Sequence, residues 1–294
     1  MKEKNKGILC IICAAFCFAL MNLFVKMSGD IPTLQKAFFR NIVAIFFSLS
    51  LLLKTHTNIA ACKRNWKFIL LRSIFGTLGI FFNFYAIDHL HISDASMLNK
   101  LSPFFAIIFS YFVLKEKAKP YQLACVLAAL TGTVFILKPG TGTLTEASLF
   151  TFISFPAFIG LLSGMSAGLA YTLLRKATSN GVPGNMVVFI FSTFSCLCSL
   201  PYCIINFTPM TLQQTVFLLL AGLAATGGQL SITAAYTYAP ASELSVYDYS
   251  QVIFAGLLGF LFIGEIPDTL SYVGYIIIIG ASVVMFLMRN RHNT

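Results

Sequence analysis

The chain has 294 residues, of which 57% are hydrophobic and only 10% are charged. Since a soluble domain typically carries ~25% charged residues, this composition excludes an ordinary soluble enzyme, a disordered protein and a nucleic-acid-binding module. The net charge of +10 would favour nucleic acid in a soluble chain, but here the cations are explained by the loops between apolar segments.

Ten apolar segments, bounded by charged residues, Pro and Gly, follow one another along the chain. Each is close to the ~20 residues that cross a bilayer as a helix. The first begins like a signal peptide but continues to Met27 without a small-residue cleavage site, so we interpret it as a retained span. We therefore predict an all-α membrane protein with ten transmembrane helices at residues 7–27, 33–53, 67–87, 95–114, 120–138, 156–176, 185–206, 212–235, 241–264 and 269–288.

Lysine and arginine are unevenly distributed between the two sets of loops. With the N-terminus placed inside, the cytoplasmic segments hold 14 of them, and the opposite side holds only Lys138. Anionic lipid and the membrane potential both favour this asymmetry. We predict a multi-pass protein of the cytoplasmic (inner) membrane with both termini in the cytoplasm.

The second span carries Lys36 and Arg40, which share one helix face because they are spaced i,i+4. A cation stripe facing lipid is unfavourable, so this face should point into the bundle. One interpretation is a site for a carboxylate or phosphate, which Arg40 can bind with two parallel hydrogen bonds. The other is a cation that ties helix ends together. Lys26, Lys36 and Arg72 also lie near enough to span ends to extend to the lipid headgroups.

The connection between the third and fourth spans contains His89 and Asp94, a His-x4-Asp pattern that some acyltransferases use as a base and its orienting acid. His89 and His91 with the nearby carboxylates also suggest a weak metal site. The segment is short and no catalytic domain surrounds it. We therefore favour a solvated loop in which Ser93 or Asp94 caps the next helix, and we expect no enzyme activity, metal or cofactor. A multispan acyltransferase is the alternative function.

Lys100 in the fourth span and Asp248 in the ninth lie deep in the membrane, as Arg40 does. Their expected axial separation of ~10 Å is too large for direct contact unless a helix is broken. The pair would hold a zwitterion between its charges or exchange partners during transport, with an uncoupled structural role as the alternative. Asp248 is the candidate for proton coupling, because ionisable groups at this depth are functional by default.

Polar and aromatic residues complete the predicted cavity, since tyrosine can stack on a planar substrate and also donate a hydrogen bond. Packing or an interfacial position is the alternative for each tyrosine. In the sixth span, Gly160, Gly164 and Gly168 recur every four residues, which predicts close packing against another backbone. The remaining substrate-binding candidates are Asn83, Tyr85, Asn99, Tyr247, Tyr249 and Gln251, and Asn22, Tyr171 and Gln229 lie in other spans.

The chain repeats internally. The segment from Ala95 to Glu116 resembles the segment from Ala241 to Glu265, and a proline follows each glutamate. We therefore expect two halves, residues 1–145 and 146–294, with five spans each. An odd number of spans forces the halves to insert with opposite orientation, which is the inverted-repeat plan of many secondary transporters.

The fourth span of the first half contains Leu-Ser-Pro-Phe-Phe and ends at Glu116. The fourth span of the second half contains Tyr-Ser-Gln-Val-Ile-Phe and ends at Glu265. With ten spans in two halves, the chain resembles the EamA-type members of the drug/metabolite transporter superfamily. The resemblance implies alternating-access transport of small metabolites, often export of amino acids or related compounds, and some similar members import vitamins or nucleoside-like cofactors. The second half has Val252 where the first has Pro103, so the repeat is broken there.

We therefore predict a secondary active transporter for a small anionic or zwitterionic metabolite, with proton coupling as a candidate mechanism. Two deep cations against one deep anion favour an anionic or zwitterionic substrate. The expected partners are a small-molecule substrate and the lipid bilayer, without nucleic acid, and a homodimer is a candidate assembly. A structural or receptor-like membrane protein is a third alternative.

Overall fold

The computed structural model describes residues 2–53, 59–115, 119–137, 154–238 and 246–291, and within these ranges the regular structure is entirely helical. Two charged residues named above, Lys138 and Glu116, lie outside these ranges. The helices are α1 (Lys2–Met27), α2 (Thr33–Leu52), α3 (Ile59–Arg64), α4 (Trp66–His89), α5 (Ile92–Asn99), α6 (Ser102–Val113), α7 (Pro120–Leu137), α8 (Phe155–Ser179), α9 (Gly184–Ile205), α10 (Leu212–Tyr238), α12 (Ser250–Ile263) and α13 (Thr269–Arg291).

Ten segments of the described chain are long and apolar enough to cross a membrane. Eight are single helices. The fourth span, Ile92–Val113, consists of α5 and α6, and the ninth, Val246–Ile263, includes α12. The prediction of an all-α protein with ten membrane-spanning segments is confirmed, with ends that differ from the predicted ones by a few residues.

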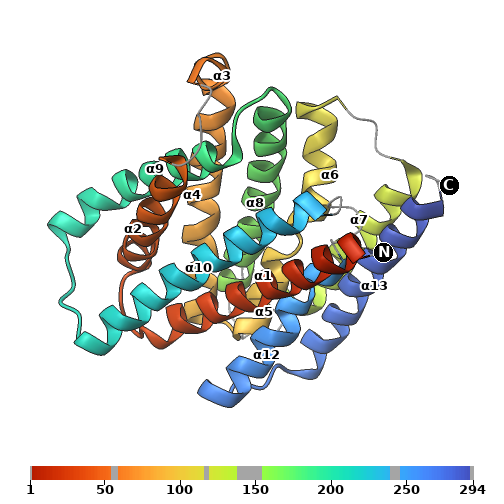
Figure 1. The fold of residues 1–294 in the computed structure, drawn as a ribbon. Helices are drawn as coiled ribbons and strands as arrows, with labels where there is room; N and C mark the ends of the chain where they lie inside the picture. The colour runs from red at the N-terminus through yellow and green to blue at the C-terminus, as the bar shows by residue number, and fades with distance from the viewer. Residues whose placement is uncertain (1, 54–58, 116–118, 138–153, 239–245, 292–294) are drawn as a thin grey trace, which may run out of the picture.

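The helices pair in a pattern that stays the same when the two halves are exchanged. In the first half α1 packs against α10 and α12, and in the second half α8 packs in the corresponding way against α4 and against α5 and α6. Helices α2 and α9, α5 and α12, and α7 and α13 each meet their own counterpart. Figure 1 shows α1 beside α10 and α4 beside α8. This exchange symmetry is what two repeats of five spans produce.

The fourth and ninth spans are both interrupted partway along their length. Lys100 and Leu101 separate α5 from α6, and a turn at Tyr249 precedes α12. Pro103, in the first turn of α6, favours the first break, because proline has no N–H to continue the preceding helix. Residues 246–263 contain no proline, so the second break has another cause. The two breaks lie where α5 and α12 meet.

The glycine stripe of α8 lies against the backbone of the broken fourth span. A Cβ atom at Gly164 would lie 2.4 Å from the carbonyl oxygen of Leu98, and one at Gly168 would lie 2.7 Å from that of Ser102. Only glycine permits so close an approach of two backbones. The prediction of close packing along this stripe is confirmed.

Candidate functional site

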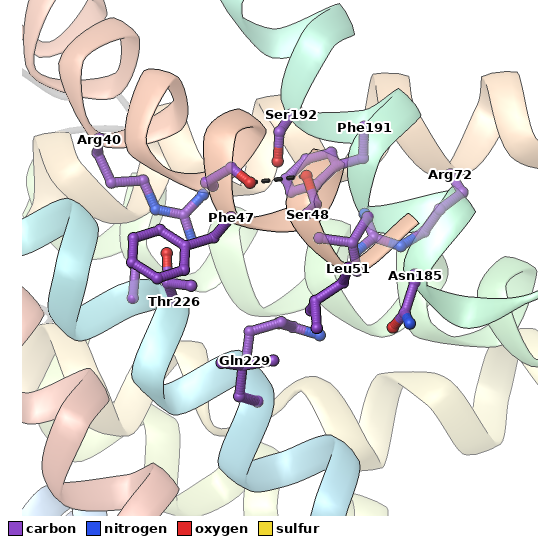
Figure 2. Close-up of a pocket in the computed structure, with 14 residues that line it drawn as sticks. Arg40, Phe47, Ser48, Leu51, Arg72, Asn185, Phe191, Ser192, Thr226 and Gln229 are labelled. Atoms are coloured by element: carbon purple, nitrogen blue, oxygen red, sulfur yellow. Dashed lines mark hydrogen bonds between the residues drawn. The ribbon is translucent and has the colours of Figure 1, made fainter. Parts of the chain in front are cut away.

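A pocket lies between α2, α4, α9 and α10, which are the second and third spans of each half (Figure 2). It is narrow, since the space open to the centres of water molecules measures about 50 Å³. Most of its polar groups are amides, hydroxyls and guanidinium groups. The lining residues are Arg40, Ala44, Phe47, Ser48, Leu51, Arg72, Asn185, Val188, Phe191, Ser192, Ala225, Thr226, Gln229 and Leu230.

The pocket lies between the middle of the bundle and one of its two ends. The middle and C-terminal parts of α2 and α10 and the N-terminal halves of α4 and α9 line it. Helices α2 and α10 run towards the end that carries α3, which we call the α3 end, and α4 and α9 start at that end. At the opposite end, which we call the latch end, residues 28–32, 90–91, 206–211 and 264–268 connect the helices.

Arg40 extends into the pocket from α2 and is 9% exposed. Its Nη1 donates a hydrogen bond of 2.6 Å to Oδ1 of Asn41, whose Nδ2 donates one of 2.8 Å to Oγ of Ser195 on α9. This chain of bonds fixes the guanidinium group between two helices of different halves. Its Nε has no hydrogen-bond partner among the described residues. The deep, inward-facing position predicted for Arg40 is the observed one.

Arg72 enters the pocket from α4, on the side opposite Arg40 (Figure 2). Its side chain was expected to extend to the lipid headgroups, and this expectation is wrong, since the residue is 8% exposed. Its guanidinium carbon lies 4.5 Å from the ring centroid of Phe191, a cation–π contact. The physical reason is that α8 and α9 cover this stretch of α4 and keep lipid away from it.

A cluster of polar contacts joins the helix ends at the latch end. The Lys26 ammonium lies 2.5 Å from Oε1 of Glu265 and also donates to the carbonyl oxygen of Leu90. The backbone N–H of Ile92 donates to Oε2 of Glu265 over 2.8 Å. Lys26 therefore does not extend to the headgroups as expected, because a carboxylate of the other half lies within its reach.

Glu265 also corrects the predicted helix cap. Ser93 or Asp94 was expected to cap the fourth span, but α5 begins at Ile92, with His91 at the cap position. A carboxylate from the second half accepts the N–H of Ile92. An acid near a helix N-terminus is favourable because the N–H groups there have no partner within the helix. The cap thus joins the two halves of the molecule.

Lys36 lies at the latch end rather than in the pocket. Its ammonium lies 2.5 Å from Oδ1 of Asp88 on α4, and the residue is 1% exposed. Neighbouring Gln35 exchanges two hydrogen bonds with the backbone of Thr208, of 2.8 and 3.0 Å. The face that Lys36 and Arg40 share does point inward, as predicted. Lys36 is held in an ion pair, which agrees with the interpretation of a cation that ties helix ends together, and it does not reach the headgroups.

Lys100 and Asp248 are in direct contact at the two helix breaks. The Lys100 ammonium lies 2.5 Å from Oδ2 of Asp248, and the Tyr249 hydroxyl donates a 3.0 Å hydrogen bond to the carbonyl oxygen of Lys100. The expected separation, which assumed unbroken helices, is wrong because both helices are interrupted at this level. The pair lies outside the pocket between α2, α4, α9 and α10.

The other candidates are spread over several environments, and none of them lines the pocket around Arg40. Asn99 donates to Ser163, Tyr85 borders a separate apolar groove, and Tyr247 is 37% exposed. Asn83 and Gln251 are buried within the bundle. Asn22, from the wider list, donates to Ser96. Gln229, which was named among the polar residues of other spans, does line the pocket. The other uncharged polar lining residues were not predicted from the sequence; they are Ser48, Asn185, Ser192 and Thr226.

His89 and Asp94 do not form the pair that the acyltransferase alternative requires. Nδ1 of His89 lies 2.9 Å from the carbonyl oxygen of Tyr85, and its ring stacks on the Tyr85 ring. Asp94 accepts a 2.5 Å hydrogen bond from the Tyr275 hydroxyl and lies 3.2 Å from the ring of His91. The acyltransferase alternative, which the sequence did not favour, therefore lacks its dyad, because each of the two residues has another partner.

Comparison with known proteins connects this geometry to a family. The EamA-like transporter family model matches residues 5–138 and again 154–287. The chain is 30% identical to the pseudopaline exporter CntI of Pseudomonas aeruginosa, with 96% of each chain covered. It is 24% identical to the human solute carrier family 35 member G1, over 94% of this chain and 78% of that one. It is 26% identical to a riboflavin transporter of Rhizobium johnstonii, over 97% and 91%.

A solved crystal structure shares the fold. It aligns with 99% of this chain and 99% of its own, at a TM-score of 0.64 and 16% sequence identity.

Proposed function

The chain belongs to the EamA-like transporter family and is a multi-pass membrane transporter, and from this premise we propose that it is a secondary transporter that works by alternating access. Its cargo in this proposal is a small anionic or zwitterionic metabolite. The binding site is the pocket around Arg40, with the lipid bilayer as its surroundings. No catalytic step is part of this function.

One observation carries the proposal: the pocket reaches from mid-bundle towards the α3 end, while an ion pair and hydrogen bonds join both halves at the latch end. In alternating access, a site between two repeats is closed on one side while the other side is accessible. The contacts of Lys26 with Glu265 make the latch end the closed side. Exchange of the roles of the two halves would close the α3 end instead.

We assign the α3 end to the cytoplasm, because the loops there carry most of the lysine and arginine of the chain. Both termini then lie in the cytoplasm, the membrane is the cytoplasmic one, and the structure is an inward-facing state. The two repeats in this proposal are residues 1–145 and 146–294.

Asp248 is the residue we assign to proton coupling. Its side chain lies at a helix break, where its Oδ2 contacts Lys100 and its Oδ1 has no hydrogen-bond partner among the described residues. A lysine–carboxylate pair between the two halves can separate and re-form when they move, and protonation of the carboxylate weakens the pair.

Arg40→Gln tests the proposed site. Purified protein is first screened by thermal shift against a metabolite library, because a ligand that binds only the folded state raises the Tm. Uptake of the identified compound is then measured in proteoliposomes. We expect Arg40→Gln to reduce uptake by about tenfold or more, since one charge-assisted hydrogen-bonding group is lost from a desolvated site.

Arg64→Gln is the control for that measurement, because it removes the same charge from an exposed position on α3. It should leave uptake unchanged. Equal uptake kinetics of the Arg40→Gln variant and the original protein would remove Arg40 from the site. Vesicles that neither accumulate nor release any compound of a broad panel would instead favour a structural or receptor-like role.

A further inference from the structure

The charges around the pocket are unbalanced. Arg40 and Arg72 both line it, and both are at most 9% exposed. Neither forms an ion pair within the described part of the chain, and no aspartate or glutamate lines the pocket. Burial of an unpaired cation is costly, so two of them in one narrow pocket favour the entry of negative charge.

Several hydrogen-bond donors of the same pocket are left over. Nε of Arg40, Nε and Nη1 of Arg72, and Oγ of Ser192 are buried and have no partner among the described residues. Buried donors of folded proteins are nearly always paired. Acid oxygens are the acceptors that guanidinium groups bind best, often through two parallel hydrogen bonds. The donors therefore match acid groups in kind as well as in charge.

Among the described residues, the pocket offers no carboxylate to pair with an ammonium group. Two described carboxylates of the bundle, Asp88 and Asp248, are held by Lys36 and Lys100 and lie outside the pocket. A zwitterion such as an amino acid would bring its ammonium group next to two guanidinium groups. Like charges in a desolvated site repel strongly, so the site discriminates against an amino group on the ligand.

The two arginines extend into the pocket from opposite sides, with apolar side chains such as Ala44, Phe47 and Val188 also on its walls (Figure 2). We propose that this pocket binds a small organic dianion with an acid group at each end and no ammonium group, of the dicarboxylate class. Arg40 binds one acid group and Arg72 binds the other. The inference rests on the proposed function, because it names the cargo of that same pocket.

Matched pairs of probes test the inference on the intact purified protein in lipid nanodiscs. Glutarate and succinate are dianions, and glutamate and aspartate are the same skeletons with one added ammonium group. Binding is measured by isothermal titration calorimetry. We expect the two dianions to bind about tenfold more tightly, or better, than their amino counterparts. Equal affinity within each pair, or no binding of either dianion, overturns the inference.

Variants connect the binding to the two arginines. Arg40→Gln and Arg72→Gln should each weaken glutarate binding by about tenfold, and Arg64→Gln should not. Unchanged binding in both pocket variants overturns the inference. If a variant fails to fold, as judged by gel filtration and its melting curve, Arg40→Lys or Arg72→Lys takes its place, and the probe pairs on the original protein still decide.

Transport in proteoliposomes is measured separately from binding in nanodiscs. Glutarate that binds in nanodiscs but does not move in proteoliposomes supports the inference and contradicts the proposed transport function. Transport of a neutral or zwitterionic compound through an Arg40-dependent route, with no dianion binding, supports the transport function and overturns the inference.

Discussion

Arg72 lies in the pocket because a neighbouring glycine leaves room for it. A Cβ atom at Gly76 would lie 2.0 Å from Nη1 of Arg72 and 2.8 Å from the ring of Phe191. The guanidinium group thus lies beside the backbone at Gly76 and 4.5 Å from the ring centroid of Phe191, within the range of cation–π contacts. The spacing i,i+4 of Arg72 and Gly76 on one helix face was the signal in the sequence that could have revealed this.

Gly76→Ala should displace the Arg72 side chain without removing its charge. The added methyl group occupies the position of Nη1, so the guanidinium group must leave the Phe191 ring. We expect glutarate affinity to fall by about tenfold, measured by calorimetry. Gly79→Ala, one turn further along α4, is the control, because its Cβ would meet neighbours no closer than 3.5 Å. Equal loss of affinity in both variants would contradict the account of Gly76.

Asp248→Asn tests the proposed coupling residue. The amide keeps the shape of the side chain but cannot take up a proton, and it leaves Lys100 without a charged partner. We expect accumulation driven by a pH gradient to be lost, while exchange of substrate without a gradient continues. Lys36→Gln, which breaks a buried ion pair elsewhere, should keep the pH dependence of any activity that remains. A gradient response that persists in Asp248→Asn would exclude this carboxylate.

At the scale of single helices, the broken fourth span depends on the helix that it packs against. The stripe of Gly160, Gly164 and Gly168 on α8 lets α5 and α6 approach so closely that the backbone atoms themselves touch. This contact holds the break at Lys100 in place, and the break in turn allows the Lys100 side chain to reach Asp248. A structural stripe on one helix therefore positions a charge on another.

Gly164→Ala should destabilise this contact. The added Cβ would lie 2.4 Å from the Leu98 carbonyl oxygen, and a backbone atom cannot rotate away as a side-chain end can. Overpacking of this kind costs about 1–3 kcal/mol, which a lower Tm in nanodiscs should reveal. Gly280→Ala on α13 is the control, because nothing lies within 4 Å of its Cβ position. A Gly164→Ala protein as stable as the control would show that the helices have room to shift.

At the scale of the whole molecule, the two ends of the bundle are joined differently. The latch end holds Lys26 with Glu265, Lys36 with Asp88, and Tyr275 with Asp94. Of these, the first and the third join the two halves. The pocket lies on the other side, towards the α3 end. In the proposed alternating-access cycle, a closed latch end and an accessible α3 end define one state, so the strength of the latch should set how often the molecule leaves that state.

Glu265→Gln should weaken the latch and shift the population towards the opposite state. The variant loses the ion pair with Lys26 and weakens the cap on Ile92. Ser192→Cys, placed in the pocket of a cysteine-free background, reports access to membrane-impermeant thiol reagents. We expect labelling from the latch side to increase and labelling from the α3 side to decrease. Identical labelling from both sides, with and without Glu265→Gln, would contradict a latch role.

The sequence alone determined the class of the protein. Long apolar segments can satisfy the hydrogen bonds of their backbone in lipid only as helices, so length and composition were sufficient to find ten spans. Two similar segments, each ending at a glutamate that a proline follows, were sufficient to suggest two halves. Arg40 was also predictable, because a deep cation in the middle of a span has no favourable place in lipid. The glycine stripe of α8 predicted close packing because glycines that recur every four residues leave one helix face without side chains.

Only the tertiary structure decided which charges share a site. Lys26 and Lys36 were placed near span ends and Lys100 deep in the membrane, yet each is held by a carboxylate, whereas Arg40 and Arg72 line a pocket without one among the described residues. These pairings depend on where helices distant in the chain cross and where two of them break. An ion pair needs its charged atoms within about 4 Å of each other. Contacts of residues 148 positions apart, such as Lys100 and Asp248, therefore follow from packing and not from local sequence.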